Sequence, residues 1–190
     1  MKNIYSNIIN FNSKNFNKIL KNLKNNGIIG LPTETVYGLA GNAYSNNSIK
    51  KIFNVKKRLK KNPLIIHYYN LNQAKKDVVL DQKFYKVYRK FSPGPITFIV
   101  KRKNNSQIKP VACANLKTVG IRFPKNKIIR KILKKLSFPL AMPSANKSSS
   151  ISPVTPKDVS EEFNNKIKVI NGGISKIGIE STVLNLVGHI

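Results

Sequence analysis

Five polar stretches interrupt the apolar runs of this sequence, and they hold most of the side chains that could do chemistry. They are LPTETVYGL (31–39), KKRLKKNPLIIH (56–67), TVGIRFP (118–124), MPSANKSSSISPVT (142–155) and GIESTV (178–183). Each lies at the end of a strand or helix pattern, and α/β folds bind their ligands at strand ends. These stretches are therefore the candidate site.

The stretch KKRLKKNP combines a lysine, an arginine and an amide in a short space. In an extended segment Lys56 and Arg58 project from the same face, and Asn62 is biased towards extended geometry because it precedes a proline. An ammonium group beside a guanidinium fork suits phosphate or carboxylate oxygens. Three further lysines of the segment are interpreted as a solvated basic face: Lys57, Lys60 and Lys61.

The other stretches also have structural explanations that need no ligand. Thr33, Glu34 and Thr35 could cap a helix, PSANKSSSIS could be a plain loop, and Glu180 with Ser181 could be a strand edge. The sequence contains neither the G-x-x-x-x-G-K-[ST] nor the G-x-G-x-x-G nucleotide-binding motif. His67 has no G-x-S-x-G partner, which argues against a Ser-His-Asp hydrolase.

The charge of the chain has two explanations. Lys and Arg number 35 against 7 Asp and Glu, a formal net charge of +28, and such an excess suggests a polyanion such as RNA or a nucleotide. Of those 35, however, only 5 are arginines, and Lys, Asn and Ile share A/T-rich codons, so biased base composition explains the excess equally well. The sequence leaves both open.

Cysteine and histidine usage excludes a disulfide framework and a structural zinc. Cys113 is the single cysteine and is expected to be a small buried residue, and His67 and His189 are the two histidines. No metal site is predicted. The start lacks the apolar core of a signal peptide, and no apolar run reaches the roughly 18 to 20 residues of a membrane span, so we expect a cytoplasmic protein without a membrane contact.

The elements that must position the site alternate between helix and strand. Helices are predicted around 16–23, at 47–57 with a start at Ser48, at 81–91, at 125–136, and after Thr155, which would cap a helix with Pro156 at its first position. Strands are predicted at 27–32, 62–69, 96–102, 118–124, 168–173 and 181–187, and 138–146 is predicted to be a strand that enters a polar loop. The alternation indicates an α/β fold, and no linker or repeat divides residues 1–190.

Taken in order, the motifs resemble a known family. LPTETVYGL, Lys56-x-Arg58 with NPLIIH, SPGPIT, TVGIRFP, PSAN followed by SP.T, and GIESTV look like the signature of YrdC-like threonylcarbamoyl-AMP synthases, called TsaC in bacteria. The resemblance covers about residues 12 to 187. It implies one YrdC-like domain, with a twisted mixed sheet curled into an open barrel, flanking helices and an electropositive cleft.

The resemblance also implies an activity. Members of the family are nucleotidyltransferases that combine L-threonine, bicarbonate and ATP into threonylcarbamoyl-AMP and release pyrophosphate. Proteins of a threonylcarbamoyl-transferase complex then pass the group to adenosine 37 of tRNAs that read ANN codons. A direct tRNA contact by this chain is left open. Mg²⁺ is expected to arrive with the ATP phosphates, because seven scattered acids provide no dedicated metal cage.

Site residues follow from the matching positions. By similarity, the threonine site comprises Thr35, His67, Arg122, Met142 through its backbone, and Ser181. The nucleotide site comprises Arg58, Asn62, Thr118, Ser144 and Ser152. Lys56 and Arg58 are the predicted catalytic pair, aligning two anionic reactants, while Glu34 and Glu180 are expected to be structural or outer-shell residues.

Two departures from the family pattern and two rival functions accompany this hypothesis. Lys57 and Leu59 stand where the family often has Gly and Pro. The sequence ends at LVGHI, short of an arginine-bearing segment found in many members, so we expect weaker and more salt-sensitive nucleotide binding. One rival is the carbamoyl-adenylate-handling domain of a carbamoyltransferase, although those chains carry Cys-rich zinc fingers. The other is a non-catalytic RNA-binding module.

Overall fold

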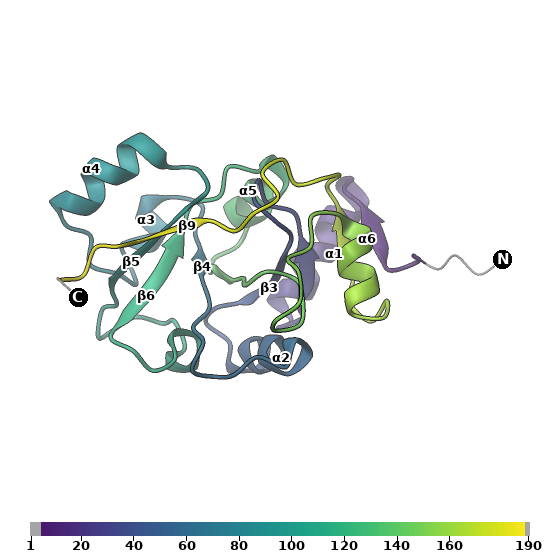
Figure 1. Ribbon diagram of the computed structural model, residues 1–190, viewed down its shortest axis with the longest axis horizontal. Coiled ribbons are helices and arrows are strands. Elements are labelled where there is room, and N and C mark those ends of the chain that lie inside the picture. Colours follow the sequence, from purple (N-terminus) through teal and green to yellow (C-terminus); the bar gives the residue numbers. More distant parts are fainter. Residues whose placement is uncertain (1–4, 189–190) are drawn as a thin grey trace.

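The computed structural model describes residues 5–188, so the predicted limits at 1 and 190 and His189 lie outside the described part. Within that part nine strands form one mixed sheet in the order β1-β8-β2-β3-β7-β4-β6-β5-β9 (Figure 1). They are β1 (Ile8–Asn10), β2 (Ile29–Leu31), β3 (Gly38–Asn42), β4 (Ile66–His67), β5 (Ile96–Lys101), β6 (Thr118–Arg122), β7 (Leu140–Ala141), β8 (Val169–Asn171) and β9 (Thr182–Asn185). The organisation of residues 1–190 as a single domain stays a prediction.

Helices flank this sheet. They are α1 (Ser13–Lys24), α2 (Asn46–Lys56), α3 (Leu71–Ala74), α4 (Gln82–Phe91), α5 (Lys127–Lys135) and α6 (Pro156–Glu162), with a 3₁₀ turn η1 (Pro110–Cys113). The sheet remains open, because β1 and β9 lie at opposite ends of its order. The predicted open, twisted mixed sheet with flanking helices is confirmed. No helix within residues 5–188 is long and apolar enough to cross a membrane.

Polar side chains set the helix starts. Thr155 caps α6 and Pro156 is its first residue, as the sequence predicted; Asp158 completes a capping box with Thr155, and Asp81 caps α4. The predicted start of α2 at Ser48 is wrong. Ser45 is the N-cap, since its hydroxyl accepts the Ser48 amide at 3.3 Å, whereas Ser48 lies buried in the first turn.

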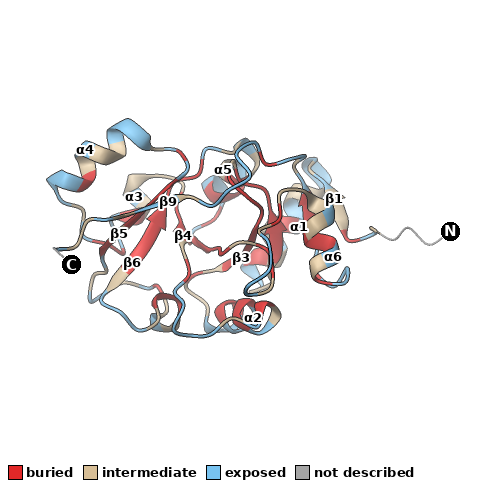
Figure 2. Ribbon diagram, in the orientation of Figure 1, coloured by how far each residue is buried: buried red, intermediate tan, exposed pale blue. Residues whose placement is uncertain are grey.

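Two apolar clusters hold the helices to the sheet. The apolar faces of α1 and α5 share one cluster with β2, including Ile19, Leu23 and Ile132. A larger cluster joins α2, α4, β5 and β6. Figure 2 shows buried strands in the centre of the molecule and exposed outer faces on α1, α4 and α5.

Several strands are shorter than predicted, and β1, β3, α3 and η1 were not predicted. β4 covers only two residues of the predicted 62–69, because Pro63 has no amide proton and the Leu64 amide bonds to the Ala112 carbonyl instead. β3 contains two glycines, which weaken the strand pattern. Gly38 is required there by packing, since a Cβ atom would lie 2.5 Å from Met142 Cγ.

Candidate active site

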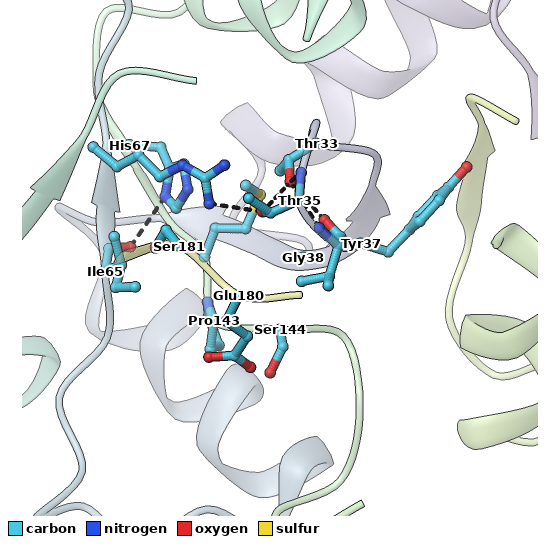
Figure 3. A pocket seen from close by; sticks show the side chains of 13 residues that line it. Thr33, Thr35, Tyr37, Gly38, Ile65, His67, Pro143, Ser144, Glu180 and Ser181 are labelled. Carbon is cyan, nitrogen blue, oxygen red and sulfur yellow. Dashed lines mark hydrogen bonds between the residues drawn. The ribbon is translucent and has the colours of Figure 1, made fainter. Parts of the chain in front are cut away.

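A pocket opens where β3, β4 and β6 meet the segment leading into β9 (Figure 3). It encloses about 300 Å³ of empty space, part of it open to solvent. All five residues predicted to face threonine line it: Thr35, His67, Arg122, Met142 and Ser181. Ser144, predicted to face the nucleotide, lines it too, so the structure brings these distant motifs together.

The register of the sheet explains this convergence. His67 on β4 lies opposite Arg122 on β6, and Arg122 lies opposite Thr97 on β5. Residues opposite one another in neighbouring strands project to the same face of a sheet. Ser181 directly precedes β9, whose first residue pairs with Ile96. Three strand pairings therefore place these side chains around one opening.

A threonine turn shapes the LPTET segment. The Thr33 hydroxyl accepts the Thr35 and Val36 amides at 3.1 and 3.2 Å and donates to the Val36 carbonyl at 2.6 Å. The segment therefore turns into β3, and the alternative of a helix cap is wrong. Because the Thr33 proton is already donated, Thr35 must donate in the 2.8 Å bond between the two hydroxyls.

Arg122 is buried and held on three sides. Its Nε donates to the Gly94 carbonyl at 3.4 Å, its Nη1 to Thr35 Oγ1 at 2.9 Å and its Nη2 to Glu34 Oε1 at 2.6 Å. A guanidinium has five N–H donors, so one remains on each terminal nitrogen. These two N–H groups have no hydrogen-bond partner within residues 5–188 and are available to a carboxylate.

Glu34 fixes the orientation of this arginine. Its second carboxylate oxygen accepts the amides of Lys125 and Asn126, at 2.9 and 3.0 Å, ahead of α5. Glu34 and Arg122 also form the one salt bridge found among residues 5–188. Glu34 thus does not line the pocket but fixes Arg122, which does. This agrees with the structural or outer-shell role expected for it.

His67 lines the pocket and has a lone pair without a hydrogen-bond partner in the described part of the chain. Its Nδ1 lies 3.3 Å from the Ile65 carbonyl, which can only accept, so Nδ1 carries the proton and Nε2 is an acceptor. Nε2 is buried and has no hydrogen-bond partner within residues 5–188. Burial, followed by the nearby Arg122 charge, holds the pKa of His67 well below its usual value, so the ring is neutral at physiological pH.

Ser181 has a partner that sequence reasoning missed. Its hydroxyl lies 2.7 Å from that of Thr97, a buried residue of β5. The only signal in the sequence was one polar residue within the apolar strand ITFIV. Thr97 therefore positions the Ser181 hydroxyl at the pocket.

The Lys56 ammonium is buried against the loop that carries Ser144. It donates to the Ser144 carbonyl at 2.5 Å, to the Asn146 carbonyl, and weakly to Asn146 Oδ1 at 3.4 Å. The Lys56 carbonyl in turn accepts the Ser148 amide at 3.0 Å. Lys56 thus ties the PSAN loop to the end of α2, a role that sequence reasoning did not foresee, and Asn146 was missed with it.

The environment of Lys56 weakens its hold on a proton. Burial, with the positive charge of Arg58 as the second cause, lowers the pKa of Lys56 from 10.5 to about 8. The carboxylates of Glu180 and Glu162 act in the opposite direction. The ammonium is therefore charged at neutral pH but titrates close to it.

The extended geometry predicted for Lys56 to Arg58 is wrong. Lys56 is the last residue of α2, and Lys57 adopts the left-handed conformation, with φ at 50°. A residue in the left-handed conformation directly after the last helical residue ends the helix. The chain therefore turns away from α2 at Lys57. Lys57, Lys60 and Lys61 are exposed, as predicted.

Arg58 closes a small loop. Its guanidinium donates to the carbonyls of Asn62 and Pro63, both at 3.0 Å. Arg58 and Asn62, two of the predicted nucleotide residues, are thereby neighbours. Thr118 is the first residue of β6, four residues before Arg122, and it pairs with Lys101 of β5.

Ser152 joins the site through Glu180. Its hydroxyl donates to Glu180 Oε1 at 2.8 Å, and Glu180 itself lines the pocket. The Glu180 charge also acts on both Lys56 and Arg58. Glu180 therefore lies between the predicted threonine and nucleotide residues.

The pocket has a defined polarity. Arg122 contributes two donors, while Thr35 and His67 contribute acceptors. Such a set suits a ligand that carries a carboxylate together with amine or hydroxyl protons. Among residues 5–188 no three His, Cys, Asp or Glu side chains are grouped to hold a metal ion.

Comparison with known proteins identifies relatives of this chain. The family model Sua5/YciO/YrdC, described as "Telomere recombination", matches residues 21–190. A threonylcarbamoyl-AMP synthase of Pyrococcus abyssi is 38% identical over 164 residues, which cover 84% of this chain and 47% of that protein. A putative threonylcarbamoyl-AMP synthase of Methanocaldococcus jannaschii is 31% identical, covering 98% of this chain and 89% of the relative.

A solved structure agrees with these relatives. The P. abyssi Sua5 crystal structure complexed with L-threonine superposes with a TM-score of 0.90 at 34% identity, covering 95% of this chain and 54% of that one. The chain spans about half the length of three curated relatives that it matches, namely 47%, 47% and 44%.

Proposed function

The chain belongs to the Sua5/YciO/YrdC family, and from that premise we propose that it makes threonylcarbamoyl-AMP from L-threonine, bicarbonate and ATP. The reaction releases pyrophosphate and makes the chain a nucleotidyltransferase. Relatives that carry the name threonylcarbamoyl-AMP synthase support this activity.

The observation that carries the proposal is the polarity of the pocket. L-threonine has one carboxylate, an amine and a hydroxyl. The two free Arg122 donors suit the carboxylate, and the acceptors on Thr35 and His67 suit the amine or hydroxyl protons. The solved relative holds L-threonine, which agrees with this assignment.

The chemistry joins two anions and needs alignment more than a nucleophilic side chain. The threonine amine and bicarbonate form a carbamate with loss of water, and a carbamate oxygen attacks the α-phosphorus of ATP while the bond to pyrophosphate breaks. Positive charge beside the phosphates lowers the repulsion between the reactants. Arg58 is proposed to supply this charge.

Lys56 is proposed to act mainly through the PSAN loop. The loop acceptors already engage its three N–H groups, so its charge stabilises the Ser144 and Asn146 carbonyls. Ser144 then faces the nucleotide from a fixed position, with Asn62, Thr118 and Ser152 completing that side. The Lys56 ammonium also contributes positive charge near the reacting phosphates.

Mg²⁺ is proposed to enter with ATP. The described residues offer no group of three candidate ligands, and Glu180 already accepts from Ser152. A metal held mainly by phosphate oxygens fits this donor set. We further propose that the product is used in the cytoplasm by a threonylcarbamoyl-transferase complex acting on tRNA.

Pyrophosphate release tests the proposed function. The chain is incubated with ATP and Mg²⁺, and threonine or bicarbonate is left out in turn. We expect release only with both present, and Thr35→Val should weaken the response to threonine because it removes an acceptor. Equal release with and without threonine and bicarbonate would refute the proposal.

A further inference from the structure

The stretch SPGPIT is one of the ordered motifs of the sequence, yet none of its residues was predicted to belong to the site. In the structure it contacts the supports of two pocket residues. The Gly94 carbonyl accepts Arg122 Nε at 3.4 Å. The Pro95 carbonyl accepts the amide of Thr182, the residue after Ser181, at 3.0 Å. SPGPIT therefore fixes the Arg122 side chain and the backbone next to Ser181.

The last residue of the stretch, Thr97, completes this support. It lies in β5 with 1% of its surface exposed, and its hydroxyl is 2.7 Å from that of Ser181. Thr97 also lies opposite Arg122 in β6, so the two side chains project to the same face of the sheet. The bond thus holds the Ser181 hydroxyl on the side of the pocket that Arg122 forms.

The burial of Thr97 determines which hydroxyl donates in this bond. Its Oγ1 has no other hydrogen-bond partner within residues 5–188. If Ser181 donated, the Thr97 proton would be buried without an acceptor, which is costly. Ser181 is partly exposed and lines the pocket, so its own proton can reach a ligand or water. Thr97 is therefore the donor and Ser181 the acceptor.

A fixed direction of this bond makes Ser181 a donor to the pocket. Its proton joins the two free N–H groups of Arg122, while Thr35 and His67 present acceptors. An ionised carboxylate can accept all three donors, because its two oxygens offer about four lone-pair sites.

We infer that Thr97 is a positioning residue that directs the Ser181 proton into the pocket, where Ser181 donates to the carboxylate of the ligand beside Arg122. The inference rests on the proposed function, since L-threonine is the ligand by which it is tested. It assigns the donor of the bond and gives SPGPIT a role in binding.

Thr97 also packs within the sheet, and the test must separate the two roles. A Cβ atom on Gly120 would lie 3.3 Å from Thr97 Cγ2, so the methyl group of Thr97 covers this glycine. Thr97→Val keeps the branched shape and removes the hydroxyl. Thr97→Ser keeps the hydroxyl and removes the methyl group. A role in hydrogen bonding and a role in packing therefore predict opposite orders of the two variants.

Affinity for L-threonine is measured by titration calorimetry without ATP, and KM and kcat are measured by pyrophosphate release. Thr97→Val should lose about three- to tenfold in affinity and raise KM for threonine by a similar factor. Its kcat should change less than about twofold, because the contact is made equally in the ground state and the transition state. Thr97→Ser should stay within about twofold of the unaltered chain in affinity and KM, and a larger loss in Thr97→Ser than in Thr97→Val would overturn the inference.

Ser48→Ala is the matched control. The Ser48 hydroxyl is buried, lies outside the pocket and has no hydrogen-bond partner within residues 5–188. Its removal should change affinity for L-threonine less than about twofold. A loss equal to that of Thr97→Val would show that removing any buried hydroxyl weakens the site, and would overturn the inference.

A double-mutant cycle tests whether Thr97 acts through Ser181. Ser181→Ala should lose at least as much affinity as Thr97→Val. Adding Thr97→Val to Ser181→Ala should then change affinity less than about twofold, because no hydroxyl remains to be directed. Additive losses would overturn the inference, since Thr97 would then act by another route.

A second ligand tests the carboxylate. L-2-aminobutyrate keeps the carboxylate and amine of L-threonine and lacks its hydroxyl, so Thr97→Val should lose the same factor for both. A loss confined to L-threonine would overturn the assignment of Ser181 to the carboxylate. No binding of L-threonine by the unaltered chain would contradict the proposed function and the inference together. Equal binding by the unaltered chain and Thr97→Val would overturn the inference alone.

Discussion

Single side chains in this pocket act by fixing one another. Glu34 accepts a hydrogen bond from Arg122, and Thr33 accepts one from the Thr35 hydroxyl and so fixes the direction of its proton. Lys56 donates to the carbonyl of Ser144 and so fixes the PSAN loop. The groups that would meet the substrates are thereby oriented before binding. Substituting one of these supporting residues should therefore reduce turnover even where its side chain does not itself contact a substrate.

Arg58 and Lys56 should differ sharply from the neighbouring Lys60. We expect Lys56→Ala and Arg58→Ala each to reduce turnover at least about tenfold, since a hydrogen bond to a charged group contributes roughly 1.5 to 3 kcal/mol. Lys60→Ala should have little effect, because Lys60 is exposed. Steady-state rates of the folded variants check this, and equal losses at all three positions would show that the segment acts only as diffuse positive charge.

The pH dependence of kcat/KM should report Lys56. Its pKa of about 8 means that the ammonium is lost as the pH rises above neutrality, which weakens the hold on the PSAN loop. We expect kcat/KM for ATP to fall through pH 8 in the unaltered chain. The same inflection in Lys56→Met would show that another group titrates.

Stability should move in the opposite direction over that range. The folded-state pKa of Lys56 lies below its unfolded value, so the unfolded chain binds more protons between about pH 8 and 10.5. The Lys56 contribution to the free energy of unfolding therefore rises with pH in this window. Comparing the unfolding of the unaltered chain with that of Lys56→Met separates this effect from loss of fold.

At the scale of elements, the end of a helix determines where two site residues lie. Lys56 is the last residue of α2, and Lys57 then turns the chain in a left-handed conformation towards Arg58. Glycine adopts that conformation without the steric cost that lysine bears.

Lys57→Gly should therefore stabilise the chain by up to about 1 kcal/mol. The matched control is Lys50→Gly, an exposed lysine within α2, which should destabilise by about 1 kcal/mol. Chemical denaturation of both variants measures the two signs. Destabilisation by Lys57→Gly would show that its side chain, and not its backbone, matters here.

At the scale of the whole molecule, charge dominates. A formal net charge of +28 is accompanied by a single salt bridge among residues 5–188. Like charges on a compact chain repel one another, and salt screens that repulsion over about 8 Å at physiological ionic strength. The molecule should thus be stabilised by salt.

We expect the free energy of unfolding to rise by about 1 kcal/mol between low and physiological ionic strength. For a chain of this size, that change raises Tm by about 2–4 °C. Thermal unfolding in a series of NaCl concentrations measures it. A Tm that falls with salt would mean that attractive pairs outweigh the repulsion.

Sequence motifs predicted much of the fold and of the site. The parts that were not predicted depend on contacts between segments that lie far apart in the sequence. The helices other than α3, the Thr155 cap of α6 and the convergence of Thr35, His67 and Arg122 agree with the sequence analysis. The β3 strand was missed because its glycines serve packing against Met142, which lies far away in the chain. The partners Thr97 and Asn146 were missed because hydrogen bonds across the fold leave no local pattern.

The most direct test of the account is the product itself. The purified chain is given ATP labelled at the α-phosphate, labelled threonine, bicarbonate and Mg²⁺, and the products are separated and identified by mass. The account predicts one adduct that carries both labels and has the mass of threonylcarbamoyl-AMP, formed by the unaltered chain and Lys60→Ala but strongly reduced in Arg58→Ala. Labelled AMP or ADP without any threonine-containing adduct would contradict it.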